Sequence, residues 1–594
     1  MTGSRLLLAL AAVAVGFAAA DTYVVVLALP DMMSSVGLAV DQLQRAAPIV
    51  SGFLLGYVAM LPLIGRIADL RGRVPVLVGS LSVLALGSLV TAGAYDLPSM
   101  VAGRFLQGLG GGGLVPATLA LVADLYPTSQ RGVPLGVVGA VQELGSVLGP
   151  LYGALVLAYA PWQAIFVINV VVALILAAAL RRTTGVTRGH GHSTGGIPLG
   201  KRPQRWGRRH EVASAPPDWP GGLLLALALV ALVLTLTQPT PLTSDVTLGL
   251  GFVPVFGDSR WLAPVGLATV VLAGLLLLRC LTAARPLVDV RRWATLARQA
   301  DLLGATLLAA ALAGVILAFA SADPQVAVLS PAGPWLLLGT VVFLFLFWLH
   351  GRRTAEPLVP RGVLTARPAW GALAVSLFVG AALIAALVDI PIFARLTVYP
   401  ESQLDAALVL VRLLVALPVG ALAGGFLVRR LPAAGVTTAG MLLAAGGFAW
   451  MSTWGLTSLA QPLATVPLVL TGLGFGLALA PVNAALLAAT APGQHGVASA
   501  FLVVSRMVGM LVGISALTTI GLRRYYSAQA ALPEPSRVCS SGTQCAAYTR
   551  LLKEAGLEQL QTVFAGAAIC AMVAALLALA LFRAAPVRSA TVPL

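Results

Sequence analysis

Acidic residues lie inside three of the long apolar segments of this chain, at Asp21, Glu143 and Asp389. A carboxylate is costly to keep in hydrocarbon, so each is a candidate functional residue that needs a partner. Arginines inside other apolar segments can supply the positive charge: Arg104, Arg412 and Arg506. Protonation of a carboxylate would break such an ion pair and free its arginine, which is the chemistry of a titratable switch.

The depths of these residues predict which of them pair. At ~1.5 Å per helical residue, Asp21 lies ~24 Å above Arg5, and Arg104 lies roughly 9 Å below the outer face, at a similar height. Glu143 and Arg506 both lie roughly 15 Å from the inner face by the same rise. We therefore expect an Asp21–Arg104 pair and a Glu143–Arg506 pair, the second bridging two halves of the molecule.

A third pair, Asp389 with Arg412, is expected nearer the outside. The alternative interpretation of all three is a static ion pair that only neutralises its own charges, because unpaired charge in hydrocarbon is so unfavourable.

The elements that hold these residues are membrane helices. The chain has 594 residues, of which 59% are hydrophobic and 10% charged, against roughly 25% charged in soluble domains. Its apolar runs are about twenty residues long, enough to cross ~30 Å of hydrocarbon. The fold class is an all-α polytopic membrane protein with about sixteen spans, expected at 6–29, 48–67, 75–94, 98–122, 133–158, 163–180, 219–238, 261–281, 299–320, 333–350, 370–394, 405–427, 434–456, 463–489, 497–522 and 559–582.

The net charge of +16 does not indicate nucleic-acid binding, because the basic residues lie in short loops between apolar runs. Loops that contain arginines alternate along the chain with loops that contain few or none. The positive-inside rule predicts this alternation for a bacterial inner-membrane protein with both termini in the cytoplasm. The first apolar run continues past Ala18-Ala19-Ala20 to about Pro30, so a spanning helix is expected there and not a cleaved signal peptide.

A repeated hairpin divides the chain. Arg285-Pro286-Leu287-Val288 and Glu356-Pro357-Leu358-Val359 each follow one span and precede another. Six spans, four inserted spans and six more result, and two six-helix bundles are what an alternating-access transporter needs. The predicted domains are an N-terminal bundle, a basic cytoplasmic linker, the four inserted helices, and a C-terminal bundle with a periplasmic loop at 523–558: residues 1–182, 183–218, 219–351 and 352–594.

The loop predicted after the second span contains Gly65, Asp69, Arg71, Gly72 and Arg73. The glycines permit a tight turn, and the aspartate can cap a helix or pair with the arginines. Such a charged loop can act as a cytoplasmic gate that holds two bundles together and releases them. The alternative is an ordinary positive-inside turn.

The fifth apolar segment has Gly145, Gly149 and Gly153 on one helix face, with Pro150 among them. Small residues there let another helix approach closely, and a proline bends a helix. Glu143 lies roughly 200° around the helix from Gly145 at ~100° per residue, so it points away from the glycine face.

These motifs resemble the major facilitator superfamily. The Gly65–Arg73 segment is similar to its signature between spans two and three, and the glycine–proline element is similar to the antiporter motif of its drug:proton exporters. Arg104 with Gln107-Gly108 resembles the fourth-span motif. The first motif departs from the family at Leu70, usually basic, and at Arg71, usually aromatic.

A narrower resemblance is to the mycobacterial triacylglyceride exporters of this superfamily. It rests on Asp21–Val26, Gln142–Gly153, Gln494–Ser499 and Arg506–Met510. The resemblance implies functional roles for Asp21, Glu143 and Arg506, a periplasmic lipoprotein partner and an effect on drug tolerance. It does not cover the middle of the chain, where that family has two linker helices and this chain is expected to have four.

Cys539 and Cys545 lie in the last external loop, where oxidising conditions favour a disulfide, with free thiols as the alternative. Residues 548–561 are expected to form an amphipathic helix that leads into the final span. The histidines lie mostly in the 183–218 linker without a ligand pattern, so no metal or other cofactor is predicted.

The sequence therefore predicts a monomeric proton-coupled transporter, not an enzyme, that exports a lipid, with triacylglyceride as the expected cargo, from the membrane toward the periplasm. A proton-coupled multidrug antiporter is the alternative, because it shares every motif above. A lipid-biosynthetic enzyme should show a compact His/Asp/Glu cluster at one membrane face, which this sequence does not indicate.

Overall fold

The computed structural model of this chain describes residues 2–38, 43–189, 218–257, 259–283, 286–320, 330–360, 362–400, 402–539 and 545–582. Fifteen helices within the described residues are long and apolar enough to cross a membrane. Helix α5 is not among these fifteen, but it has 28 residues and packs against α1. The predicted all-α polytopic fold is confirmed.

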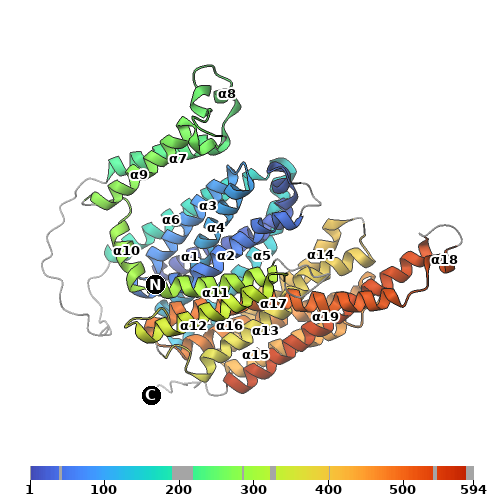
Figure 1. Cartoon of the computed structure of the whole chain (residues 1–594). Helices are drawn as coiled ribbons and strands as arrows, with labels where there is room; N and C mark the ends of the chain where they lie inside the picture. The colour runs from blue at the N-terminus through green and yellow to red at the C-terminus, as the bar shows by residue number, and fades with distance from the viewer. Residues whose placement is uncertain are drawn as a thin grey trace, which may run out of the picture.

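The N-terminal half, in blue to teal near the centre of Figure 1, contains six helices. They are α1 (Thr2–Ser35), α2 (Leu43–Arg71), α3 (Arg73–Ala92), α4 (Leu97–Leu125), α5 (Gly132–Tyr159) and α6 (Gln163–Gly189). The short 3-10 turn η2 (Thr128–Gln130) precedes α5. Because α6 continues to Gly189, the first residues of the predicted 183–218 linker are helical, and its remainder, 190–217, lies outside the described residues.

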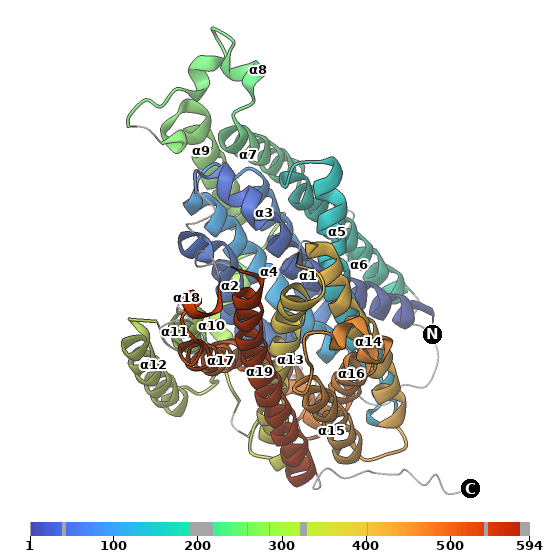
Figure 2. The ribbon, with the colours of Figure 1, turned by 90° about the vertical axis from the view of Figure 1, so that its right-hand side faces the viewer.

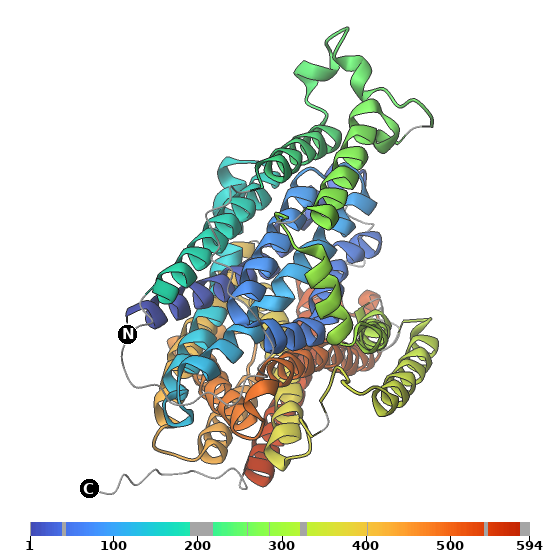
Figure 3. The same cartoon turned by 90° about the vertical axis from the view of Figure 1, so that its left-hand side faces the viewer.

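The inserted segment has two short helices that the sequence did not predict, the four-residue α8 (Thr240–Thr243) and the ten-residue α10 (Val290–Gln299). Its other members are α7 (Trp219–Thr237), α9 (Pro264–Thr282), α11 (Leu302–Ala320) and α12 (Gly333–Arg353), with the 3-10 turns η3 (Gly249–Phe252) and η4 (Arg260–Leu262). The short α10 contacts α9, α11 and α2, and Figure 3 shows it between the two inserted hairpins. It was missed because a ten-residue amphipathic helix is too short to register as a span.

The two inserted hairpins pack differently. The pair α7 and α9 contact mainly each other, and Asp218 before α7 accepts a hydrogen bond from Arg279 Nη2 at 3.0 Å. That hydrogen bond holds the pKa of the Asp218 carboxyl below its usual value. Helix α11 instead packs along α2 of the first half and also contacts α17 of the second, while α12 stands further out (Figure 2).

The C-terminal half, yellow to red in Figure 1, has two helices of 36 residues. Its helices are α13 (Arg367–Thr397), α14 (Gln403–Leu427), α15 (Ala433–Met451), α16 (Thr465–Ala488), α17 (His495–Ala530), α18 (Pro535–Val538) and α19 (Ala546–Leu581). The 3-10 turns are η5 (Ser458–Ala460), η6 (Pro462–Ala464) and η7 (Pro492–Gln494). At ~1.5 Å per residue α17 and α19 are ~54 Å long, well beyond the hydrocarbon thickness.

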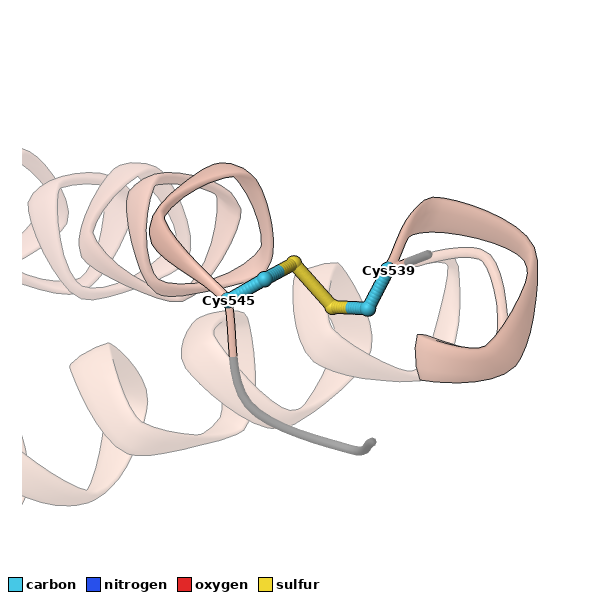
Figure 4. The surroundings of a disulfide bond; sticks show 2 residues. All are labelled: Cys539 and Cys545. Carbon is cyan, nitrogen blue, oxygen red and sulfur yellow. A yellow bond between two sulfur atoms is a disulfide. The ribbon is translucent and has the colours of Figure 1, made fainter. Parts of the chain in front are cut away.

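The amphipathic stretch at 548–561 is the first part of α19, which projects beyond the rest of its half in Figure 1. Cys539, after α18, and Cys545, before α19, are joined in a disulfide with their Cα atoms 5.7 Å apart (Figure 4). The expected disulfide is therefore present, and it joins the two ends of a short loop directly before the final long helix.

Candidate functional site

Asp21 lies in α1, and only 1% of its surface is exposed. Close contacts between α1 and α5 fix its height in the membrane. The glycines of the α5 stripe lie against Gly16, Ala20 and Val24 of α1 so tightly that a side chain at any of them would require a shift. This is the approach that the stripe of small residues predicts. Helix α5 stays helical through Pro150.

The start of α4 positions the partners of Asp21. Asp96 caps α4 by accepting a hydrogen bond from Ser99 N at 2.9 Å, which fixes where the helix begins. Two turns later, Arg104 has 1% of its surface exposed. Its Nη1 lies 3.7 Å from Asp21 Oδ2, so the structure brings together the two residues that depth arithmetic paired.

Amide side chains complete the surroundings of this pair. Gln107 Nε2 donates to Asp21 Oδ1 at 3.4 Å, and Gln107 Oε1 accepts from Arg104 Nη1 at 2.9 Å. Asn169 Nδ2 of α6 also donates to Asp21 Oδ1. The Arg104 guanidinium lies 4.5 Å from the centre of the Phe53 ring. Asp21 thus accepts hydrogen bonds from two amide side chains and forms an ion pair with Arg104, all on two helices of a single half.

Three members of this network were not singled out from the sequence. Asn169 interrupts an apolar run in α6, and a lone amide in hydrocarbon was the available signal. Ser88 and Thr91 of α3 bind the other side of Gln107, at 2.9 Å from Nε2 and 3.1 Å from Oε1 respectively. Serine and threonine are common in membrane helices, so the sequence alone gives little reason to select these two.

Glu143 faces the other half of the molecule. It is 7% exposed, and its Oε1 lies 3.9 Å from Arg506 Nη1 of α17. The Arg506 Nε is buried and has no hydrogen-bond partner among the described residues. The structure therefore brings Glu143 and Arg506 together across the halves, at a separation too long for a hydrogen bond.

The third expected pair does not form. Asp389 is 4% exposed in α13, but no ion pair among the described residues joins it to Arg412. Arg412 Nη1 instead donates to Thr465 Oγ1, at the start of α16, at 3.1 Å. Depth along a helix gives height only, and the rotation of α14 directs this arginine toward α16 instead of α13.

The segment predicted as a loop after the second span is mostly helix. Gly65 to Arg71 belong to the last turns of α2, and Gly72 alone separates α2 from α3. Gly72 has φ +96°, a left-handed value that favours glycine. Gly65 serves a different purpose, because its Cα faces the backbone of Gly496 in α17 too closely for a side chain.

Asp69 contacts the opposite half directly. Its Oδ1 accepts from Gly496 N at 3.0 Å and its Oδ2 from Val497 N at 3.2 Å, two backbone groups in the first turn of α17. A carboxylate is stabilised there by the unpaired N–H groups and the helix dipole. Arg73 Nη2 lies 2.9 Å from Asp69 Oδ1, and Arg73 Nε lies 3.0 Å from Asp124.

Arg71 of this segment contacts the insert. The Arg71 guanidinium lies 4.3 Å from the centre of the Trp293 ring in α10. We call Asp69, Arg71, Arg73, Gly496 and Trp293 the latch. A second close approach of the halves joins Gly132 and Gly136 of α5 to Gly425 and Ala421 of α14.

Comparisons with known proteins agree with this architecture. A model described as Major Facilitator Superfamily matches residues 11–330. The triacylglyceride transporter of Mycolicibacterium hassiacum is 36% identical over 566 residues, 92% of this chain and 85% of the relative. That of Mycobacterium tuberculosis is 35% identical over 537 residues, 88% and 84% of the two chains.

Among solved structures, the proton:xylose symporter XylE has a TM-score of 0.53 at 12% identity, covering 96% of this chain and 95% of that one, which supports the fold alone. The family match spans more than half of the chain, and the relatives cover nearly all of it. This chain therefore belongs to the major facilitator superfamily and is a multi-pass membrane transporter.

Proposed function

We propose that this transporter is proton-coupled and exports a lipid, a triacylglyceride, from the inner membrane toward the periplasm. The observation that carries the proposal is the Glu143–Arg506 contact, 3.9 Å across the two halves. Protonation of Glu143 removes that attraction, so a proton can change the free-energy difference between two arrangements of the halves. The cargo follows from the relatives, which are named triacylglyceride transporters.

The available energy is sufficient for such a switch. One proton moving through ~100 mV releases ~2.3 kcal/mol, before any pH gradient is added. That free energy shifts a two-state equilibrium by about 50-fold. In this mechanism Asp21 holds Arg104 inside the first half, Glu143 links the halves, and the latch closes their cytoplasmic ends until the halves rock apart.

The inserted helices are assigned two roles beside the proposed lipid route. Helix α11 contacts both α2 and α17, so it covers the flank where these two helices of opposite halves meet. We assign α11 and α12 the role of shielding that flank from bilayer lipid. The pair α7 and α9 contacts mainly itself and is assigned a tethering role within the predicted 219–351 insert.

The same proposal fixes the setting. The arginines at the latch support a cytoplasmic location for that end by the positive-inside rule. We therefore propose that both termini are cytoplasmic and that the disulfide-bonded end of α19 is periplasmic. A periplasmic lipoprotein is the proposed recipient of the cargo, and the transporter works as a monomer.

The cargo is tested by purifying the protein in mild detergent and identifying co-purified lipid by mass spectrometry. We expect triacylglyceride enriched over its share of the membrane. The Asp21→Asn variant is purified in parallel as a control for retained lipid in a non-transporting protein. Absence of neutral lipid from both, together with proton-driven efflux of amphiphilic cations from vesicles, would replace the lipid assignment with the multidrug one.

A further inference from the structure

The outer end of the second half has a groove that the transport mechanism does not use. It has a volume of about 320 Å³ and lies between α13, α17 and the first part of α19. This volume falls within the range of ligand pockets. The groove is lined by Ile392 and Leu396 of α13, Tyr525 of α17, and Thr549, Leu552, Lys553, Gly556, Gln559 and Leu560 of α19.

One face of α19 forms most of this lining. Thr549, Leu552, Lys553, Gly556 and Leu560 recur at the three- and four-residue spacing of a helix face. Gly556 keeps the floor of the groove low, since a Cβ there would come within 3.1 Å of the Leu396 side chain.

The groove is apolar, yet it lies outside the hydrocarbon. About twenty residues are enough to cross the bilayer core, and counted back from Leu581 they reach roughly residue 562. The lining residues of α19, 549–560, therefore lie in the outer headgroup layer or beyond it. Ile392, at the same end of α13, is 47% exposed. At the height of the headgroups this apolar surface faces water unless an acyl chain or another apolar group occupies the groove.

Of the lining residues that the structure describes, Lys553 has the one charged side chain. Lys553 lines the groove, and we find no ion pair for it among the described residues, whereas the acids nearby already have partners. Glu554 lies 3.3 Å from Arg550, and Glu558 lies 3.0 Å from Arg524. Residues 523–558 carry five basic and three acidic residues, a net +2, although the positive-inside rule predicts few cations on this side.

We propose that this groove binds an acidic phospholipid of the outer leaflet. One acyl chain lies between α13 and α19 over Gly556, and the anionic headgroup pairs with Lys553. The adjacent Tyr525–Tyr526 ring pair, with centroids 5.4 Å apart, lies at the level where aromatic residues gather at membrane interfaces. This site is separate from the exported cargo, because a triacylglyceride carries no charge for Lys553 to bind.

The experiment is a native mass spectrometry titration of the full-length protein in detergent. Phosphatidylglycerol and phosphatidylcholine with the same acyl chains are compared as ligands. The wild type is expected to bind phosphatidylglycerol about tenfold more tightly, the effect of one charge-assisted contact. Lys553→Gln should reduce this affinity to that of phosphatidylcholine. Arg550→Gln, on the same helix but outside the groove, is the matched control and should keep the preference.

A second variant tests the acyl-chain position. Leu552→Trp fills the groove and should weaken both phospholipids, with its melting temperature measured to show that the protein is folded. Equal binding of the two phospholipids by the wild type, or an unchanged preference in Lys553→Gln, would overturn the proposal. Displacement of phosphatidylglycerol by equimolar triolein would also overturn it, by making the groove a cargo site. Lipid export is not part of any readout, so the outcome is independent of the proposed function.

Discussion

The two ion pairs predicted from helix depth, Asp21–Arg104 and Glu143–Arg506, differ in how they are enclosed. Asp21 lies inside one half and receives contacts from Arg104, Gln107 and Asn169. Glu143 lies between the halves, and within the part of the chain that the structure describes its ion-pair partner is Arg506, at 3.9 Å. A rigid-body motion of the halves leaves the first pair intact and changes the second. We therefore propose that Asp21 fixes the electrostatics of its half, while protonation of Glu143 changes how the two halves are held together.

The largest effect is expected from Asp21→Asn. The substitution leaves Arg104 buried without a counter-charge, which costs about 3–5 kcal/mol of stability, and transport should fall to background while the protein remains folded. Proteoliposome transport and thermal unfolding measure the two effects. Adding Arg104→Gln should recover stability but not transport. Normal transport by the single variant would refute the role of Asp21.

Charge reversal separates the second pair from the first. Glu143→Arg and Arg506→Glu should each reduce transport about tenfold or more, a change of about 1.4 kcal/mol. The double reversal should recover part of this loss, because the pair is loose and lies between bodies that can adjust. The same exchange at Asp21 and Arg104 should recover nothing, since the amides around Asp21 are arranged for an acceptor. A double reversal no better than its worse single would show that Glu143 and Arg506 do not act as a pair.

The latch should show a smaller effect, on the conformational equilibrium. Asp69→Asn removes the charge from two hydrogen bonds to the α17 backbone, each worth roughly 1.5–3 kcal/mol when the acceptor is charged. Spin labels at Gln130 and Leu431, both exposed at the latch end, should then report a larger open population at that end. Cys280 and Cys570, the free cysteines, are first replaced by serine. An unchanged distance distribution would contradict the proposed latch.

The smallest effect is expected where the insert touches the latch. Trp293→Ala removes the aromatic ring over Arg71, a contact worth about 0.5–1 kcal/mol at an exposed site. The melting temperature should fall slightly, and transport should fall by no more than about fivefold, the factor that corresponds to 1 kcal/mol. Trp348→Ala, which removes a ring 3.8 Å from Arg352 on α12, is the control, since that pair does not contact the latch. Equal effects of the two variants on transport would contradict a role for α10 in gating.

The sequence predicted the helices because their apolar runs match the bilayer thickness, and it predicted the two main pairs because height along a helix follows from residue number. Height does not specify rotation, so it failed for Asp389 and Arg412. Motif boundaries failed for another reason, since Gly65 to Arg71 read as a polar loop but continue α2. Asn169 and Trp293 become partners of Asp21 and Arg71 only through tertiary packing, which no local pattern encodes.

The central claim is that protonation of buried carboxylates drives export. Triacylglyceride transport by the wild type and by Glu143→Gln, which lacks the proposed titrating carboxylate, is measured in proteoliposomes with and without an imposed pH gradient. The account predicts that the gradient accelerates wild-type transport and has no effect on the variant. Equal wild-type rates with and without the gradient would contradict it.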